Sequence, residues 1–164
     1  MQNSTSKVRV LTGTAMLGAV AAVLMYLEFP IPIMPAFVKL DVSELPALIA
    51  SFAYGPVSGI LVCLIKNLIK LPSTSTAAVG ELFNFVMGAL FVGVAGLIYK
   101  RNKTRKGAIV GALLGALVMA VVSVPYNYFI VYPAYVVMYH LPLDAIIGMY
   151  QAINPNVNGL LACL

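Results

Sequence analysis

The sequence predicts an all-α protein that crosses a membrane several times. Of its 164 residues, 62% are hydrophobic and only 9% are charged, so it lacks the polar side chains that cover a soluble domain of this size. The hydrophobic residues gather in long runs, and a helix needs about 20 apolar residues to cross a bilayer. The chain therefore has room for five or six spanning helices joined by short connections.

The first predicted helix covers residues 10–29, where a long apolar run follows Lys7 and Arg9. Loops rich in Lys and Arg stay on the cytoplasmic side of a membrane, so these two residues place the N-terminus in the cytoplasm. Residues 30–44 form an external loop, because prolines at positions 30, 32 and 35 remove backbone donors and oppose a helix.

The next apolar stretch is interrupted by Gly55-Pro56. It is either one kinked helix or two shorter helices that fold back at the break. A second basic cluster decides between them, and it consists of Lys100, Arg101, Lys103, Arg105 and Lys106. Only the folded-back arrangement puts this cluster in the cytoplasm. We therefore predict helices at 45–54 and 57–71, although both are short for a full span.

Three more helices follow, at 79–99, 107–124 and 154–164. In the fifth, Gly107, Gly111 and Gly115 recur every four residues, which leaves a bare face that suits close helix packing. The sixth begins at Asn154-Pro155, a pair typical of a cap and first turn. From Pro155 to the last residue it would rise only about 15 Å, so it is expected to be truncated.

The sequence contains no motif for nucleotide binding, for metal-dependent hydrolysis or for nucleophilic catalysis. Its cysteines, Cys63 and Cys163, and its single histidine, His140, are far apart in the sequence and do not have metal-ligand spacing. We expect no enzyme activity, no resident cofactor and no metal. The net charge of +5 is explained by membrane sidedness, so a nucleic-acid partner is not expected.

Polar residues at membrane depth are the main candidates for a binding site. Glu81 and Asn84 share one face of the fourth helix, Asn127 lies near the end of the fifth, and Asn154 and Asn158 begin the sixth. Such groups are costly in a bilayer unless they face a cavity or another polar group. They either converge on one polar ligand or hydrogen-bond between helices, and Asn154 can also serve as a cap.

Aromatic residues crowd the same external region, and Tyr126, Tyr128 and Phe129 follow one another closely. They form either an interfacial aromatic belt or the flat walls of a pocket.

Two charged pairs have local explanations. Lys66 and Lys70 lie one turn apart near the outer end of the third helix and are expected to snorkel to the lipid head groups. Asp41 and Glu44 flank Ser43 where the second helix begins, which favours a capping role.

The first helix carries two small-residue pairs, Ala15 with Ala19 and Gly18 with Ala22. Small residues four apart allow two helices to approach closely in a membrane. Packing within the chain is the ordinary explanation, and an external partner helix is the alternative.

Together these features resemble the substrate-binding S components of energy-coupling factor (ECF) transporters, most closely the riboflavin-specific ones. The resemblance covers nearly the whole chain. It rests on Ala15-Met-Leu-Gly-Ala19, Leu40-Asp-Val-Ser-Glu-Leu-Pro46, Phe52-Ala-Tyr-Gly-Pro-Val-Ser-Gly59, Lys66-Asn67, Val79-Gly-Glu-Leu-Phe-Asn-Phe85 and Ala152-Ile-Asn-Pro155.

The resemblance implies a six-helix S-component bundle in the bacterial plasma membrane, with an external vitamin pocket roofed by the first loop. It also implies a complex with a transmembrane coupling subunit and two ABC-type ATPases. The coupling subunit would meet Ala15 and Ala19, and we place Ala22 on the same surface. The alternatives are an S component for another vitamin, of the thiamine or pyridoxine type, or a membrane interaction subunit without a transport role.

The resemblance also implies which residues bind riboflavin. The family's pocket positions fall on Leu40 and its neighbour Asp41, on Asn127 and on Asn154. We add Glu81, Asn84, Tyr128 and Asn158 from their positions. The pyrimidine edge of a flavin alternates acceptor, donor and acceptor, and an asparagine offers both kinds of partner.

Overall fold

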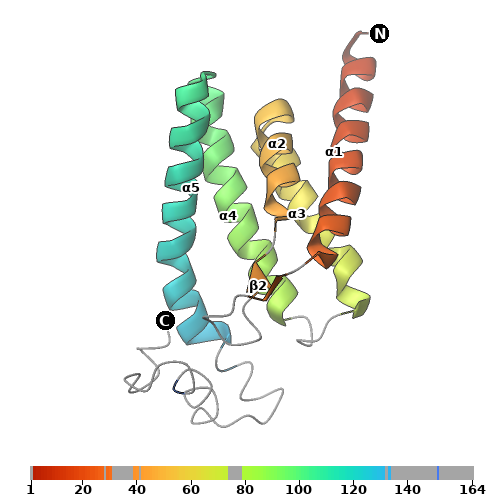
Figure 1. The fold of residues 1–164 in the computed structure, drawn as a ribbon. Helices are drawn as coiled ribbons and strands as arrows, with labels where there is room; N and C mark the ends of the chain where they lie inside the picture. The colour runs from red at the N-terminus through yellow and green to blue at the C-terminus, as the bar shows by residue number, and fades with distance from the viewer. Residues whose placement is uncertain are drawn as a thin grey trace.

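The computed structural model describes residues 2–27, 29–30, 39–40, 42–73 and 79–131, with the single residues 133 and 151. Its helices stand side by side as a bundle (Figure 1). They are α1 (Gln2–Tyr26), α2 (Glu44–Tyr54), α3 (Pro56–Lys70), α4 (Val79–Arg101) and α5 (Arg105–Tyr126). The short elements are β1 (Phe29–Pro30), β2 (Lys39–Leu40), the 3-10 turn η1 (Leu71–Ser73) and the π-helical η2 (Asn127–Val131).

The helical class predicted from the sequence is confirmed for the described residues. Within the described ranges, four helical segments are long and apolar enough to cross a membrane: Ser6–Tyr26, Pro56–Ser73, Val79–Arg101 and Arg105–Ile130. The remaining helix, α2, has 11 residues and is too short to span alone. The helix predicted at 154–164 lies outside the described residues.

The break predicted at Gly55-Pro56 is confirmed. Gly55 has φ 109°, a backbone conformation that residues with a side chain rarely adopt. Pro56 then begins α3, where its missing N–H costs no helical hydrogen bond. The two helices fold back on each other so closely that a Cβ on Gly59 would lie 2.7 Å from Cβ of Ser51 and 2.9 Å from the Ala47 carbonyl oxygen.

Most helix ends differ from the predicted ones by a few residues. Helix α1 begins earlier than residue 10 and stops at Tyr26 instead of 29, because Phe29 and Pro30 pair with Leu40 and Lys39 in a short antiparallel ladder. Helix α4 continues beyond the predicted end to Arg101, and α5 begins before the predicted start, at Arg105. An apolar run marks the part of a helix that lies in lipid, and polar residues extend the same helix beyond it.

The glycines of α5 form the predicted packing seam. A Cβ on Gly111 would lie 2.8 Å from the carbonyl oxygen of Ala95, and one on Gly115 would lie 2.6 Å from that of Phe91. Backbone therefore meets backbone along α4 and α5, as small residues permit in membrane proteins.

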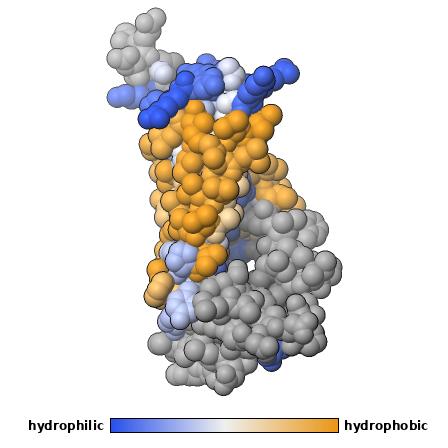
Figure 2. Space-filling model, turned by 90° about the vertical axis from the view of Figure 1, so that its left-hand side faces the viewer, coloured by the Kyte–Doolittle hydropathy of each residue, from blue (hydrophilic) through white to orange (hydrophobic). Residues whose placement is uncertain are grey.

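Seven of the ten basic residues gather at one end of the bundle, the basic end. The start of α1 and the connection between α4 and α5 lie at this same end (Figure 1), and all seven charged residues there are exposed: Lys7, Arg9, Lys100, Arg101, Lys103, Arg105 and Lys106. Below this basic end, the face in Figure 2 is a continuous apolar band. The band suits lipid, and the charges lie where head groups would be.

Replacing Gly111 with leucine should destabilise the bundle, because the new side chain meets a backbone carbonyl that cannot move aside. We expect Gly111→Leu to lower the midpoint of thermal unfolding in detergent by roughly 5–10 °C. The matched control is Ala116→Leu, since Ala116 is exposed on α5. Equal unfolding midpoints for the two variants would contradict the close packing of α5 on α4 at Gly111.

Candidate functional site

Lys66 is fully buried, with 0% of its surface exposed. Its Nζ donates to Ser43 Oγ at 2.6 Å and forms an ion pair with Glu44 Oε1 at 2.6 Å. The prediction that Lys66 snorkels to the head groups is therefore wrong. The fold brings a carboxylate within reach, and this ion pair with the hydrogen bond to Ser43 offsets the cost of removing the ammonium from water.

The predicted capping role of Glu44 is not what the structure shows, because its carboxylate pairs with Lys66 of α3. Ser43 occupies the N-cap position of α2 but makes no side-chain cap bond, since its hydroxyl accepts from Lys66 instead. Glu44 does lie in the first turn of α2, yet its carboxylate is bound to α3. Asp41 lies outside the described residues.

The carboxylate of Glu44 joins three helices. It belongs to α2, pairs with Lys66 of α3, and lies 3.6 Å from Sγ of Cys63 on α3. On α4, Gly88 packs directly against it, since a Cβ there would come within 2.6 Å of Oε1. The side chain of Glu44 is only 23% exposed. The missing side chain of Gly88 thus leaves space for the buried charge.

A second polar contact joins α3 to α4. Asn67 is buried, and its Nδ2 donates both to the Cys63 carbonyl oxygen at 2.8 Å and to Asn84 Oδ1 at 3.2 Å. Asn84, a predicted site residue, is half-buried. The sequence analysis used Asn67 only as part of the Lys66-Asn67 motif and did not predict it as a site residue, although a polar residue inside an apolar run carried the same signal as Asn84.

Two lysines of α3 hold both ends of the connection between α1 and α2. Lys70 Nζ donates to the Met25 carbonyl oxygen at 3.2 Å, near the end of α1, and Lys66 holds the start of α2. Glu81, a predicted site residue, is buried at the start of α4 and close enough to Lys70 to interact electrostatically. The β1–β2 ladder pairs the two arms of the connection.

The start of α4 meets the end of α5 through aromatic rings. Phe83 and Tyr126 have ring centroids 5.6 Å apart. The residue after Tyr126 is Asn127, which is half-buried and donates from Nδ2 to the Ser123 carbonyl oxygen at 3.0 Å. Tyr128 is exposed and packs edge-on against Phe129. These contacts lie at the end of the bundle opposite the basic residues (Figure 1).

The other predicted ligand residues are not tested by these contacts. The backbone of Leu40 belongs to β2, paired with Phe29. Asp41, Asn154 and Asn158 lie outside the described residues. The structure therefore brings Glu81 and Asn84 to one end of α4 and Asn127 and Tyr128 to the neighbouring end of α5.

The two small-residue pairs of α1 face different directions. Ala15 and Ala19 are exposed. Gly18 and Ala22 face the chain's own helices: a Cβ on Gly18 would lie 3.0 Å from Ile65, and Ala22 is 4% exposed. Placing Ala22 on a partner surface with Ala15 and Ala19 is therefore wrong, because it shares the interior face with Gly18.

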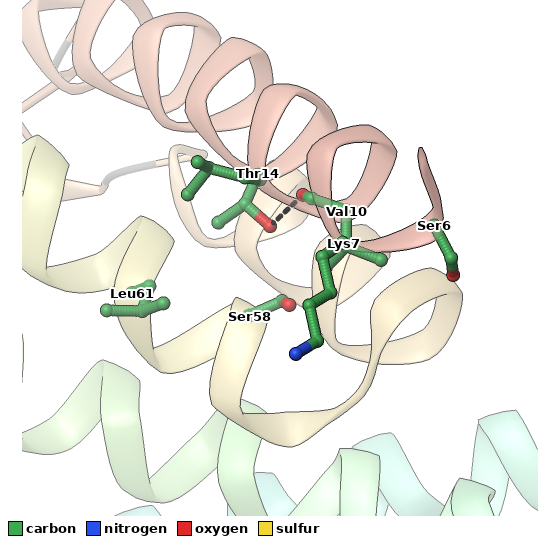
Figure 3. Close-up of a pocket in the computed structure, with 7 residues that line it drawn as sticks. Ser6, Lys7, Val10, Thr14, Ser58 and Leu61 are labelled. Atoms are coloured by element: carbon green, nitrogen blue, oxygen red, sulfur yellow. Dashed lines mark hydrogen bonds between the residues drawn. The ribbon is translucent and has the colours of Figure 1, made fainter. Parts of the chain in front are cut away.

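A shallow, mostly apolar depression of about 290 Å³ lies between α1 and α3. Figure 3 shows Lys7 reaching toward Ser58 across it, while the Thr14 hydroxyl donates to the Val10 carbonyl oxygen at 2.8 Å. Since Lys7 belongs to the basic end, this depression lies away from Asn84 and Asn127. It is not the predicted ligand site.

Comparison with known proteins places the chain in a transporter family. Residues 9–163 match the family described as "ECF transporter, substrate-specific component". The chain aligns over 93% of its length with the structure titled "Structure and mechanism of the S component of a bacterial ECF transporter", covering 86% of that chain, with a TM-score of 0.74 and 35% identity. The chain belongs to this family of ECF S components.

Two relatives carry more specific names. The riboflavin transporter RibU of Staphylococcus aureus is 39% identical over 77% of this chain and 67% of its own length. The riboflavin transporter FmnP of Bacillus subtilis is 38% identical over 83% of this chain and 73% of its own length. With its apolar helices, this chain is a multi-pass protein of the bacterial cell membrane.

Removing the charge of Lys66 should strongly destabilise the bundle, because it leaves the Glu44 carboxylate without its cation. We expect Lys66→Met to cost about 3–5 kcal/mol of unfolding free energy, measured in detergent by thermal or denaturant unfolding. Lys100→Met, at the exposed basic end, is the matched control. The double variant Lys66→Met with Glu44→Gln should recover part of the loss, and a Lys66→Met protein as stable as the control would contradict the pairing.

Proposed function

We propose that this chain is a riboflavin-binding S component. It captures riboflavin on the external side of the membrane and mediates its uptake together with an ECF coupling subunit and two ABC-type ATPases. It performs no catalysis itself. Family membership and the names of the two relatives support this proposal.

The observation that carries the proposal is the set of oriented polar groups at the end opposite the basic residues. The Nδ2 of Asn127 donates to the Ser123 carbonyl oxygen, which can only accept. The Oδ1 of Asn127 therefore faces the other way and remains as an acceptor. An N–H on the pyrimidine edge of a flavin can donate to such an oxygen. The Phe83–Tyr126 ring pair beside it offers an apolar surface for a flat heterocycle.

The remaining predicted contacts belong to the same proposed pocket. They are Leu40, Asp41, Glu81, Asn84, Tyr128, Asn154 and Asn158. Residues 1–164 would form one domain, with a sixth helix at 154–164 completing the bundle. The exposed basic residues at the start of α1 and between α4 and α5 support a cytoplasmic N-terminus.

The visible absorption spectrum of the protein purified in detergent tests the proposal. A tightly held flavin gives a yellow protein and is released on denaturation. Titration of added riboflavin, followed by quenching of its fluorescence, measures binding when no flavin is retained. Binding of thiamine or pyridoxine in place of riboflavin would identify an S component for another vitamin, and no vitamin binding with no copurifying ATPases would favour an interaction subunit.

Asn127 should contribute directly to riboflavin affinity. Removing its oxygen leaves a ligand N–H without an acceptor in a water-poor site, so Asn127→Ala should weaken binding about tenfold or more. The matched control is Asn102→Ala, because Asn102 is exposed at the basic end. Fluorescence titration of both variants measures the effect, and an unchanged affinity for Asn127→Ala would remove Asn127 from the pocket.

Ala15 and Ala19 should form part of the surface that meets the coupling subunit, since both are small and exposed on α1. A bulky side chain there would block close helix approach. We expect Ala15→Trp to abolish copurification with the ECF module while riboflavin binding by the isolated chain stays unchanged. Ala116→Trp on α5 is the control, and copurification equal to that control would place the partner surface elsewhere.

A further inference from the structure

The amide of Asn67 has only one chemically consistent orientation. It contacts the Cys63 carbonyl oxygen at 2.8 Å, and a carbonyl accepts but never donates, so the nitrogen of Asn67 must face it. The same Nδ2 contacts the Asn84 side chain at 3.2 Å. The Asn84 atom that receives this hydrogen bond must therefore be its oxygen. Asn67 thus fixes which end of the Asn84 amide faces α3.

This orientation directs the other end of the Asn84 amide away from α3. Its oxygen is occupied by Asn67, and its Nδ2 donates to no partner within the described part of the chain. Asn84 is half-buried in the second turn of α4. It follows Phe83, whose ring packs on Tyr126. A donor is therefore presented in the region of the proposed ligand site.

Asn67 leaves an acceptor unsatisfied. Its Oδ1 is buried and has no hydrogen-bond partner among the described residues, and such an atom lowers stability. An apolar side chain of similar size at position 67 would avoid that cost. Packing alone does not explain an asparagine here, whereas control of the Asn84 amide does.

We propose that Asn67 is a positioning residue that makes Asn84 a hydrogen-bond donor to a ring carbonyl of the ligand. This inference rests on the proposed function. Asn127 presents an acceptor from the start of η2 and Asn84 presents a donor from α4, so the two amides together complement a heterocycle with a carbonyl beside an N–H. The pyrimidine edge of riboflavin has this arrangement.

A double-mutant cycle on the full chain tests the inference. Riboflavin affinity is measured by fluorescence titration for the wild type, Asn84→Ala, Asn67→Leu and the double variant. Each single variant should bind about tenfold more weakly. The double variant should bind no more weakly than Asn84→Ala, because Asn67 acts only through Asn84. Thermal unfolding of the same samples reports the structural effect of each change separately.

Asn84→Asp provides a second test that keeps the contact to Asn67. One carboxylate oxygen still accepts from Asn67, while the other replaces the donor with an acceptor that repels a ligand carbonyl. Riboflavin binding should be lost by about tenfold or more even where the fold is retained. This variant decides the donor assignment if Asn67→Leu does not fold.

The outcomes separate this inference from the proposed function. Independent, multiplicative losses in the cycle would show that Asn67 acts through the fold alone. Wild-type affinity in Asn84→Ala or Asn84→Asp would overturn the donor assignment while riboflavin binding stands. A wild-type chain that does not bind riboflavin would overturn both.

Discussion

The ion pair between Lys66 and Glu44 is the interaction on which the arrangement of α2, α3 and α4 depends. Helix α2 has 11 residues, which rise only about 16 Å, so its polar start is carried inward instead of reaching the far head groups. The Glu44 side chain is only 23% exposed there, so its carboxylate needs a partner in the protein. Lys66 supplies the charge, Ser43 accepts a further hydrogen bond from it, and Gly88 leaves the space. A change at any of these positions therefore removes a charge, a hydrogen bond or the space that the other groups depend on.

Two kinds of contact hold the bundle together. Small residues bring helix backbones close at the α4–α5 seam and at the α2–α3 turn, and Gly18 of α1 makes room for the Ile65 side chain of α3. Such contacts are broad and non-directional, so they favour association without fixing one axial register. Hydrogen bonds and ion pairs are directional. The contacts from Lys66 and Lys70 fix the register of α3 against α2 and α1. This explains why one helix carries two lysines in an apolar protein.

The sequence predicted those features that depend on local chemistry. A glycine followed by proline identifies the break at Gly55-Pro56, and regular glycines identify the seam of α5, whatever the rest of the fold. Lys66 could not be predicted in the same way, because its partner Glu44 is 22 residues earlier and only the fold brings the two together. Ala22 shows a second limit: small residues reveal that a helix is closely approached, but not which face meets its own chain. The role of Asn67 could not be predicted from the Lys66-Asn67 motif, because its amide acts through a contact with Asn84 that only the fold creates. The helix predicted at 154–164, with Asn154 and Asn158, stays a prediction.

The anchoring of α1 and α2 by two lysines of α3 has a consequence for how such a protein can diversify. Lys70 holds the end of α1, Lys66 holds the start of α2, and the β1–β2 ladder joins the arms between them. Each of these anchoring contacts comes from a residue of the helices or of the ladder. A substitution at Lys66 or Lys70 would release the end of a helix together with one arm of the connection, so natural variation at these two positions is constrained by the helical frame and by the external side at once.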